Sequence, residues 1–363
     1  MSQSILIFPG GMPRSKHLAR ICREIGITAT GASSLRVDPA SAEYDRWIYL
    51  PNLGAPDFAG ALASSVEEYG FHAIYTPHPV IWQYLSAELP SLAPGVRLVQ
   101  PAPMVAAARP YSEAEEKAVS YRRRPMPLGL ESRPPIPERE LVAMLLHAEN
   151  IPGMCHPDKL FAMAEIAAAS PAGDLVEIGT WWGKSAFVML RLGRLYGIGP
   201  LLCVDPWSQN CLCQHDPNGN LNAMAATLDA GQAFSIFLAN LLPYADGDLN
   251  YLRLPSTEAA ARFESNHQVV SNEFGETGYC GRIAILHIDG NHEEESVAAD
   301  LNAWEPMMAD GGWIVFDDYC WPFGDGPRRV ADAFLSAGRT RVETSFVAGG
   351  ALFVKLSGMP GEV

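Results

Sequence analysis

The sequence contains no long apolar run. None of its 363 residues lies in an uninterrupted apolar stretch of about eighteen residues, the length at which a transmembrane helix becomes a candidate. The N-terminus has no basic stretch followed by a long apolar segment, so it does not resemble a secretory signal. Its short apolar run, Ile5–Phe8, is typical of a first β-strand. We therefore expect a cytoplasmic protein with no membrane partner.

Basic residues are also scarce. The chain has 26 Lys and Arg against 41 Asp and Glu, which gives a formal net charge of −15. Proteins that bind nucleic acid need cations to displace the counterions on phosphate, so we expect no nucleic-acid partner. We interpret the one basic cluster, residues 122–124, as a solvated face of a linker.

Cysteine forms no disulfide pattern. Seven cysteines are an odd number without framework spacing, which is typical of reduced thiols in a cytoplasm. Cys211, Cys213 and His215 have a C-x-C-x-H spacing that can bind zinc. A fourth ligand is not evident, and structural zinc usually takes four. We therefore interpret this segment as a loop near the active site.

Strand and helix signals alternate in two parts of the chain. Residues 1–100 show this alternation and predict a small Rossmann-like α/β domain. Residues 101–150 are rich in proline, which prevents regular strand pairing and stiffens the chain, so we interpret them as a linker. Short helices are expected within it, one of them at 112–121. In residues 151–363 the alternation resumes and ends in two strands joined by Gly349-Gly350, a hairpin signal. This part predicts an α/β domain whose parallel sheet ends in an antiparallel hairpin.

Two glycines mark a turn between a buried strand and a helix. Gly179 and Gly183 follow the apolar run Leu175–Ile178, and the helix begins near Lys184. Ligands of doubly wound sheets bind beyond the carboxyl ends of the strands, and glycine allows the backbone to pass close to a ligand. The G-x-x-x-G spacing differs from the G-x-G-x-x-G spacing of dinucleotide sites.

Two acids near this turn indicate the cofactor. Glu177 lies two residues before the first glycine, where its carboxylate would attract the amino group of S-adenosylmethionine and repel a pyrophosphate. Asp205 ends the next strand, where it can accept hydrogen bonds from both ribose hydroxyls. The pattern favours S-adenosylmethionine over a nicotinamide cofactor.

Three further acids follow two later strands. Asp289 ends one predicted strand, and Asp317 and Asp318 end the next. Neighbouring strands lie about 4.8 Å apart, so these strand ends bring the carboxylates together. A divalent cation removes their mutual repulsion, and oxygen ligands favour Mg²⁺, Mn²⁺ or Ca²⁺ over zinc. The alternative is that one or two of the acids only cap helices or bind arginines of the linker.

The glycine turn, Val176–Ala186, resembles motif I of class I methyltransferases. The resemblance covers roughly residues 151–356 and implies S-adenosylmethionine as the cofactor. It implies that the cofactor contacts come from Glu177, Gly179, Gly183, Lys184, Ser185, Asp205 and, as a weaker match, Ser256.

The acidic cluster resembles that of the macrocin O-methyltransferase group, which methylates sugar hydroxyls on antibiotics. The resemblance rests on the three acids and on His292, three residues after Asp289. It implies that Asp289, Asp317 and Asp318 hold Mg²⁺ (or Mn²⁺) and that His292 is the catalytic base. The sequence departs from the group at Glu294, where relatives usually have tyrosine, so we carry over no substrate contact. We interpret His287 as a core histidine that faces the other side of its strand.

The expected function is S-adenosylmethionine-dependent, metal-assisted O-methylation of a sugar, a polyol or a similar small-molecule natural product. Two alternatives stay open: a metal-independent methyltransferase that acts on a nitrogen or a carboxylate, and a non-catalytic adenosylmethionine-binding protein. Residues 1–100 resemble the domain that precedes ATP-grasp ligases. We expect this part to bind the acceptor or to make a contact in a homo-oligomer.

Overall fold

The computed structural model describes residues 4–123, 133–212, 219–337 and 341–358. The chain divides into two compact units, residues 1–113 and 114–363. No helix within the described ranges is long and apolar enough to cross a membrane.

The first unit is a parallel five-stranded sheet in the order β3-β2-β1-β4-β5. Side chains alternate between the two faces of a strand. Ile5 and Ile7 of β1 therefore pack with α1, whereas Leu6 packs with α2 and α3. This arrangement confirms the Rossmann-like α/β fold expected from the alternating pattern. The elements are β1 (Ser4–Ile7), α1 (Pro13–Glu24), β2 (Thr28–Ser33), β3 (Arg46–Tyr49), α2 (Phe58–Tyr69), β4 (Ala73–Tyr75), α3 (Pro79–Leu92) and β5 (Arg97–Leu98), with a 3₁₀ turn at Pro39–Glu43.

The proline-rich segment contains a long helix, α4 (Pro103–Arg123), where the sequence predicted a short one. Pro110 inside the helix removes one backbone hydrogen bond. The residues around it are mainly Ala and Glu, which are strong helix formers. Ala114, Ala118 and Tyr121 are buried in the core of the second unit, and this burial stabilises the helix beyond its local propensity.

The second unit is built on a seven-stranded sheet in the order β13-β14-β12-β11-β6-β7-β8. Five strands are parallel, and β14 pairs antiparallel with β12 and β13. The antiparallel C-terminal hairpin is the one that the sequence predicted. The strands are β6 (Asp174–Ile178), β7 (Leu201–Val204), β8 (Leu249–Leu252), β11 (Ile283–Ile288), β12 (Met308–Phe316), β13 (Val342–Ala348) and β14 (Ala351–Leu356).

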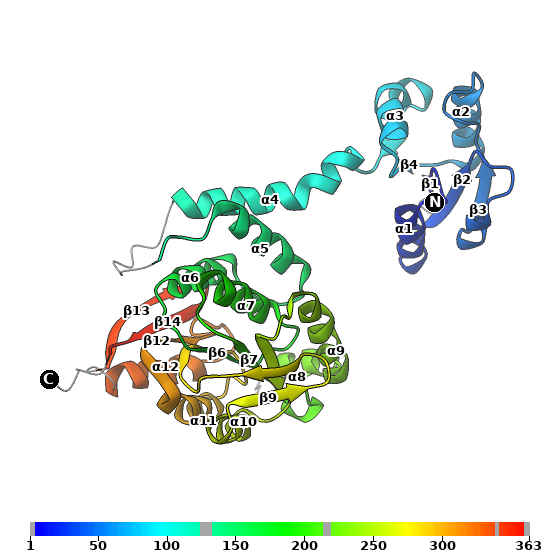
Figure 1. The fold of residues 1–363 in the computed structure, drawn as a ribbon. Coiled ribbons are helices and arrows are strands. Elements are labelled where there is room, and N and C mark those ends of the chain that lie inside the picture. The colour runs from blue at the N-terminus through cyan, green and yellow to red at the C-terminus, as the bar shows by residue number, and fades with distance from the viewer. Residues whose placement is uncertain (1–3, 124–132, 213–218, 338–340, 359–363) are drawn as a thin grey trace. The chain divides into compact units, whose positions relative to one another are not determined.

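Helices cover both faces of this sheet (Figure 1). One core includes α5 (Glu138–Asn150), α6 (Pro157–Ala168), α7 (Lys184–Tyr196) and α9 (Ala230–Leu241). The opposite core includes α10 (Ser256–Ser265), α11 (Glu294–Trp304) and α12 (Gly326–Ala337). The remaining elements are α8 (Asn220–Ala225), the hairpin β9 (Gln268–Ser271) and β10 (Gly275–Gly278), and 3₁₀ turns at Gln209–Cys211, Leu242–Tyr244 and Glu305–Met307.

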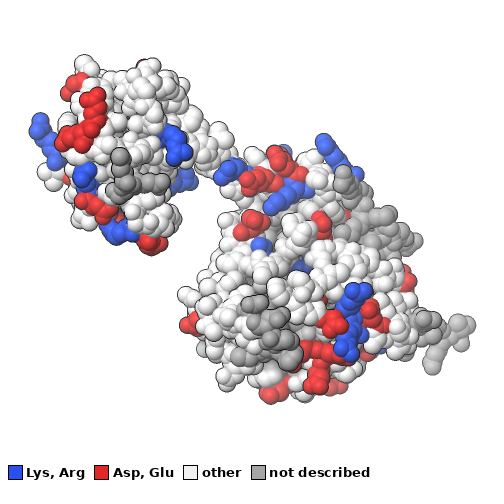
Figure 2. Space-filling view, turned by 180° about the vertical axis from the view of Figure 1, so that it is seen from behind, with Lys and Arg blue, Asp and Glu red and all other residues white. Residues whose placement is uncertain are grey.

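Surface charges are mixed. On the face that Figure 2 shows, Lys and Arg are scattered among Asp and Glu and form no extended basic area. Arg122 is paired within the fold: its guanidinium lies 3.6 Å from the Glu138 carboxylate and also donates to the carbonyl of Ile136. Arg124 lies outside the described residues.

We expect Tyr121→Ala to lower the free energy of unfolding by about 3 kcal/mol, the usual cost of deleting a buried aromatic ring. Tyr121 is stacked on Phe161 with ring centroids 4.3 Å apart. Tyr111→Ala in the same helix is the control, because its side chain is 52% exposed and should cost less than about 0.5 kcal/mol. Urea denaturation followed by circular dichroism measures both. Equal losses in the two variants would contradict burial of the C-terminal half of α4.

Candidate functional site

Four parallel strands of the second unit end at one edge of the sheet. Ile178 pairs in register with Val204 on one side and with Ile288 on the other, and Ile288 pairs with Phe316. The next residue in each chain segment therefore lies at this edge. These residues are Gly179, Asp205, Asp289 and Asp317. The register thus brings the glycine turn and the predicted metal ligands to the same edge.

A chain of buried charged groups runs across this edge. Glu177 and His287 are directly paired across β6 and β11, and Glu177 Oε1 lies 3.0 Å from His287 Nδ1. On its other side, His287 Nε2 lies 3.5 Å from the Asp317 carboxylate. Asp317 also binds the ammonium of Lys159, which lies 3.6 Å from Asp289 Oδ2. The interpretation of His287 is therefore corrected. It is fully buried but lies on the same face as Glu177 and Asp289, because residues two apart on a strand share a face.

Lys159 is not among the residues that the sequence predicted for this edge. It lies in the first turn of α6, whose start is capped by His156 Nδ1 accepting from the amide of Asp158 at 3.1 Å. Only 2% of Lys159 is exposed, and a buried lysine normally requires a partner. The sequence signal was weak: one cation in a helix whose other buried residues are apolar.

The buried charges shift one another's pKa values. Burial by itself raises the pKa of Asp317, but the Lys159 ammonium and His287 together outweigh it and hold that pKa well below its usual range. Burial and then the Asp317 carboxylate raise the pKa of Asp289. Burial by itself lowers the pKa of His287, but the carboxylates of Asp317 and Glu177 outweigh it and raise that pKa to about 9.

A second group lies on the more open side of Asp289. His292 Nε2 is 2.9 Å from Asp318 Oδ2. The His292 ring packs against Trp321 with centroids 4.3 Å apart, and Trp321 packs against Phe323 at 5.5 Å. Asp289, His292 and Asp318 are all partly exposed.

Two sets of possible metal ligands result among the described residues. One is His287, Asp289 and Asp317, and the other is Asp289, His292 and Asp318; the ligand atoms within each set lie within 4.8 Å of one another. Asp317 and Asp318 fall in different sets, because the chain turns directly after β12 and Asp318 adopts a left-handed conformation with φ +51°. The predicted ligands Asp289, Asp317 and Asp318 thus lie at one edge, with Asp289 common to both sets.

Protein packing requires glycine at two positions of the glycine turn. Gly179 has φ +81°, and a Cβ there would lie 2.0 Å from the carbonyl oxygen of Asp289. Gly183 has φ +86°, and its Cβ would lie 2.5 Å from Leu241 Cδ2. These contacts account for both glycines without a ligand. Their predicted contact with a cofactor stays a prediction.

Asp205 joins the loops that follow β6 and β7. Its carboxylate accepts hydrogen bonds from the amides of Trp181 at 2.9 Å and Trp207 at 2.7 Å. The indole of Trp207 donates to the carbonyl of Trp181 at 2.8 Å. Burial raises the pKa of Asp205 to about 6, although both amide hydrogen bonds oppose the shift.

The other predicted cofactor residues lie in different surroundings. Glu177 Oε2 is buried and has no hydrogen-bond partner among the described residues, and its contact with the cofactor's amino group stays a prediction. Lys184 donates to the carbonyl of Gly153 at 3.3 Å, and Ser185 is buried. Ser256 accepts from the Trp304 indole at 3.0 Å, so its hydroxyl is already engaged by the protein.

Backbone strain is concentrated at this edge. Among the described residues, non-glycine positive φ angles occur at Trp181 (48°), Trp207 (40°) and Asp318 (51°). Each follows a strand of the sheet edge. Such conformations cost roughly 1–3 kcal/mol each and are frequent at functional sites.

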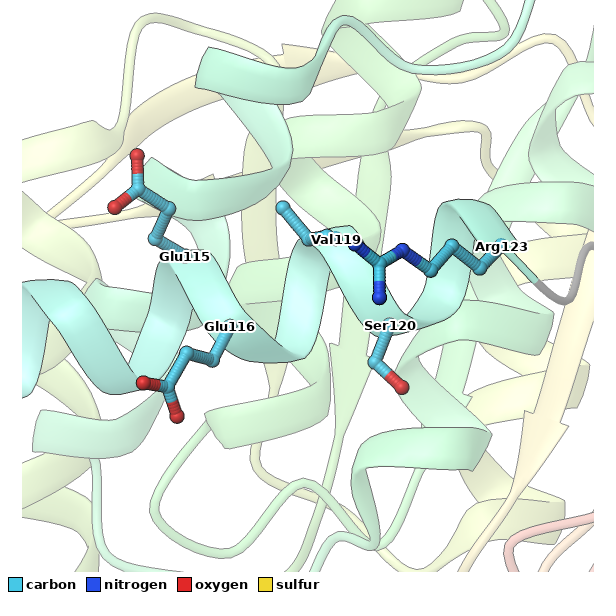
Figure 3. A pocket seen from close by; sticks show the side chains of 5 residues that line it. All are labelled: Glu115, Glu116, Val119, Ser120 and Arg123. Atoms are coloured by element: carbon cyan, nitrogen blue, oxygen red, sulfur yellow. The ribbon is translucent and has the colours of Figure 1, made fainter.

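Two other features do not extend the site. Of the three residues in the suggested zinc group, the structure describes only Cys211, which is exposed. Cys213 and His215 lie outside the described residues. A hollow on α4 is lined by Glu115, Glu116, Val119, Ser120 and Arg123 (Figure 3). All five come from one helix, and none is a predicted site residue.

The match to a family model agrees with this geometry. Residues 176–319 match a family described as a methyltransferase domain. Together with the sheet order and the C-terminal antiparallel hairpin, this identifies the class I methyltransferase fold. Residues 176–319 therefore form a methyltransferase domain within the second unit.

Several solved structures are similar to the chain at low identity. The O-methyltransferase NovP is 16% identical over 55% of this chain and 79% of its own, with a TM-score of 0.40. CalS11, a TDP-rhamnose 3'-O-methyltransferase of calicheamicin biosynthesis, is 15% identical over 67% and 93%, with a TM-score of 0.36. MycE of the mycinamycin pathway, in complex with Mg and SAH, is 15% identical over 53% and 47%, with a TM-score of 0.32. Similarity at this level says nothing about this chain's acceptor or metal. No curated protein matches the chain in sequence.

We expect Asp205→Asn to weaken S-adenosylmethionine binding at least tenfold, about 1.4 kcal/mol. The ionised carboxylate accepts ribose hydroxyls better than a neutral group. Since the pKa of Asp205 is about 6, affinity should fall as the pH drops through 6. Folding itself favours the protonated form, so acid does not destabilise the protein through this group. Calorimetry between pH 5 and pH 8 measures the affinity, with exposed Asp57→Asn as the control. The assignment fails if affinity is unchanged in Asp205→Asn.

Proposed function

We propose that this methyltransferase transfers a methyl group to a hydroxyl of a sugar, a polyol or a similar small-molecule natural product, with help from a divalent cation. The observation that carries the proposal is the group of Asp289, His292 and Asp318, at the sheet edge where the cofactor loop also ends. A hydroxyl needs a base and nearby positive charge to act as a nucleophile at neutral pH. In this group His292 is the candidate base, and the two carboxylates can hold a cation.

His292 is proposed as the base. His292 Nε2 lies 2.9 Å from the Asp318 carboxylate, which would stabilise the ring once it has taken up a proton. S-adenosylmethionine, when bound, supplies the methyl group. His292 would take the proton of the acceptor hydroxyl.

Asp289 and Asp318 are the residues that would hold the cation. Mg²⁺ is commonly bound through one or two carboxylates while it keeps several waters, and these two carboxylates are both partly exposed. A bound cation would supply charge that lowers the pKa of a neighbouring hydroxyl. Asp317 is less available because it binds Lys159.

An aromatic surface beside His292 supports a sugar-like acceptor. Trp321 lies against the base, and Phe323, which is 56% exposed, lies beside Trp321. The apolar face of a sugar ring packs well on aromatic rings. Acceptor binding here would place a hydroxyl next to His292.

A metal-independent methyltransferase acting on a nitrogen or a carboxylate is the second candidate. The observation that favours it is Lys159, which already brings a positive charge to Asp289 and Asp317. A chelator separates the two candidates, and the absence of transfer to every acceptor class would favour a non-catalytic binding protein.

We expect EDTA to abolish methyl transfer to a sugar hydroxyl and Mg²⁺ or Mn²⁺ to restore it. His292→Ala should lower kcat about a hundredfold, the usual worth of a general base, while S-adenosylmethionine affinity stays unchanged. His267→Ala, an exposed histidine of the same unit, is the control. Transfer of radiolabelled methyl groups measures the rates. Full activity in EDTA on an aliphatic hydroxyl would overturn metal assistance.

We expect Trp321→Ala to raise the KM for the acceptor about tenfold, which corresponds to about 1.4 kcal/mol of lost binding, because it removes the aromatic face beside His292. Trp321→Phe keeps an aromatic ring and should recover most of this loss. Initial rates at varied acceptor concentration measure the effect. An unchanged KM in Trp321→Ala would place the acceptor elsewhere.

A further inference from the structure

Lys159 contacts two of the acids that make up the sets of possible metal ligands. Its ammonium binds Asp317 and lies 3.6 Å from Asp289 Oδ2. Asp289 and Asp317 belong to the inner set, His287–Asp289–Asp317, whereas Asp289 also belongs to the outer set, Asp289–His292–Asp318. One side chain therefore meets two of the three members of the inner set.

The position of Lys159 is fixed by its backbone. It follows Pro157 in the first turn of α6. The turn between β13 and β14 packs directly on it: a Cβ at Gly349 would lie 2.4 Å from the Lys159 amide nitrogen. The side chain is fully enclosed, and its long stem has no exposed position to move to without opening this packing.

We propose that Lys159 is a permanent internal cation that keeps divalent metal out of the inner set. The ammonium occupies the space between Asp289 and Asp317 that a bound ion would need, and its charge repels a second cation there. Metal is left with the outer set, where Asp289 and Asp318 are partly exposed. The inference rests on the proposed function for its claim that the outer set takes a cation. Its claim about the inner set is independent of that function.

Neighbouring acids that differ in their contact with Lys159 provide a matched test. The probe is Mn²⁺, whose free concentration is read by electron paramagnetic resonance on the full-length protein. We expect Asp318→Asn to weaken Mn²⁺ binding at least tenfold and Asp317→Asn to change it less than threefold. Equal weakening by the two substitutions, or greater weakening by Asp317→Asn, overturns the proposal.

Removal of the ammonium is the converse test. Lys159→Met keeps the approximate length of the side chain without its charge and should bind a second Mn²⁺ or bind Mn²⁺ at least tenfold more tightly. The double variant Lys159→Met/Asp317→Asn should lose this gain. Wild-type stoichiometry and affinity in a Lys159→Met protein with a native circular dichroism spectrum overturn the proposal. If Lys159→Met folds only with Mn²⁺ present, the inner set has become a metal site as proposed; if it does not fold at all, the Asp317 and Asp318 variants decide.

The two proposals fail in different ways. If wild-type protein binds no Mn²⁺ but Lys159→Met does, exclusion by Lys159 stands and metal assistance fails. If wild-type protein binds Mn²⁺ and the affinity depends on Asp317, metal binding stands and exclusion by Lys159 fails.

Discussion

The ion pair between Lys159 and Asp317 links the elements on which the site is built. It joins the first turn of α6 to the end of β12, and Asp289 at the end of β11 lies within reach of the same ammonium. Buried carboxylates at adjacent strand ends repel one another, so the edge requires a compensating charge. Removing one partner of such a pair leaves an uncompensated buried charge, which costs about 3–5 kcal/mol. The acidic edge therefore depends on α6 being in place.

The same edge carries two chemically different halves. Around Asp205, backbone amides and indole rings join the loops after β6 and β7. Around Asp289, ionisable side chains dominate. Glu177 and His287 connect these halves, since they pair across the two central strands of the sheet. Strand register consequently brings the predicted cofactor residues and the acidic group to one edge of the sheet.

The C-terminal half of α4, together with α5, belongs to the second unit. Tyr121 of α4 and Leu141 of α5 are buried in the same core as α6 and α7. This core positions α6, and α6 carries Lys159. Packing far from the strand ends can therefore influence the charge balance of the site.

The sequence by itself determined the alternation of strands and helices, the C-terminal hairpin, and the acids that follow the strands. These features depend on residues close together in the chain: a period of apolar residues, a pair of glycines, an acid after a strand. The sequence could not reveal the buried face of α4, because Ala114, Ala118 and Tyr121 are buried only by their contact with the rest of the second unit.

Only the tertiary structure decided how the acids are shared. Lys159 and Asp317 are 158 positions apart, and nothing local to either residue indicates the other. His287 was assigned to the wrong side of its strand, and its pairing with Glu177 follows from the register between β6 and β11. Asp317 and Asp318 are adjacent in the chain yet belong to different groups, because the chain turns directly after β12 and Asp318 adopts a left-handed conformation. Charge compensation acts through space, and the fold alone determines which charges meet.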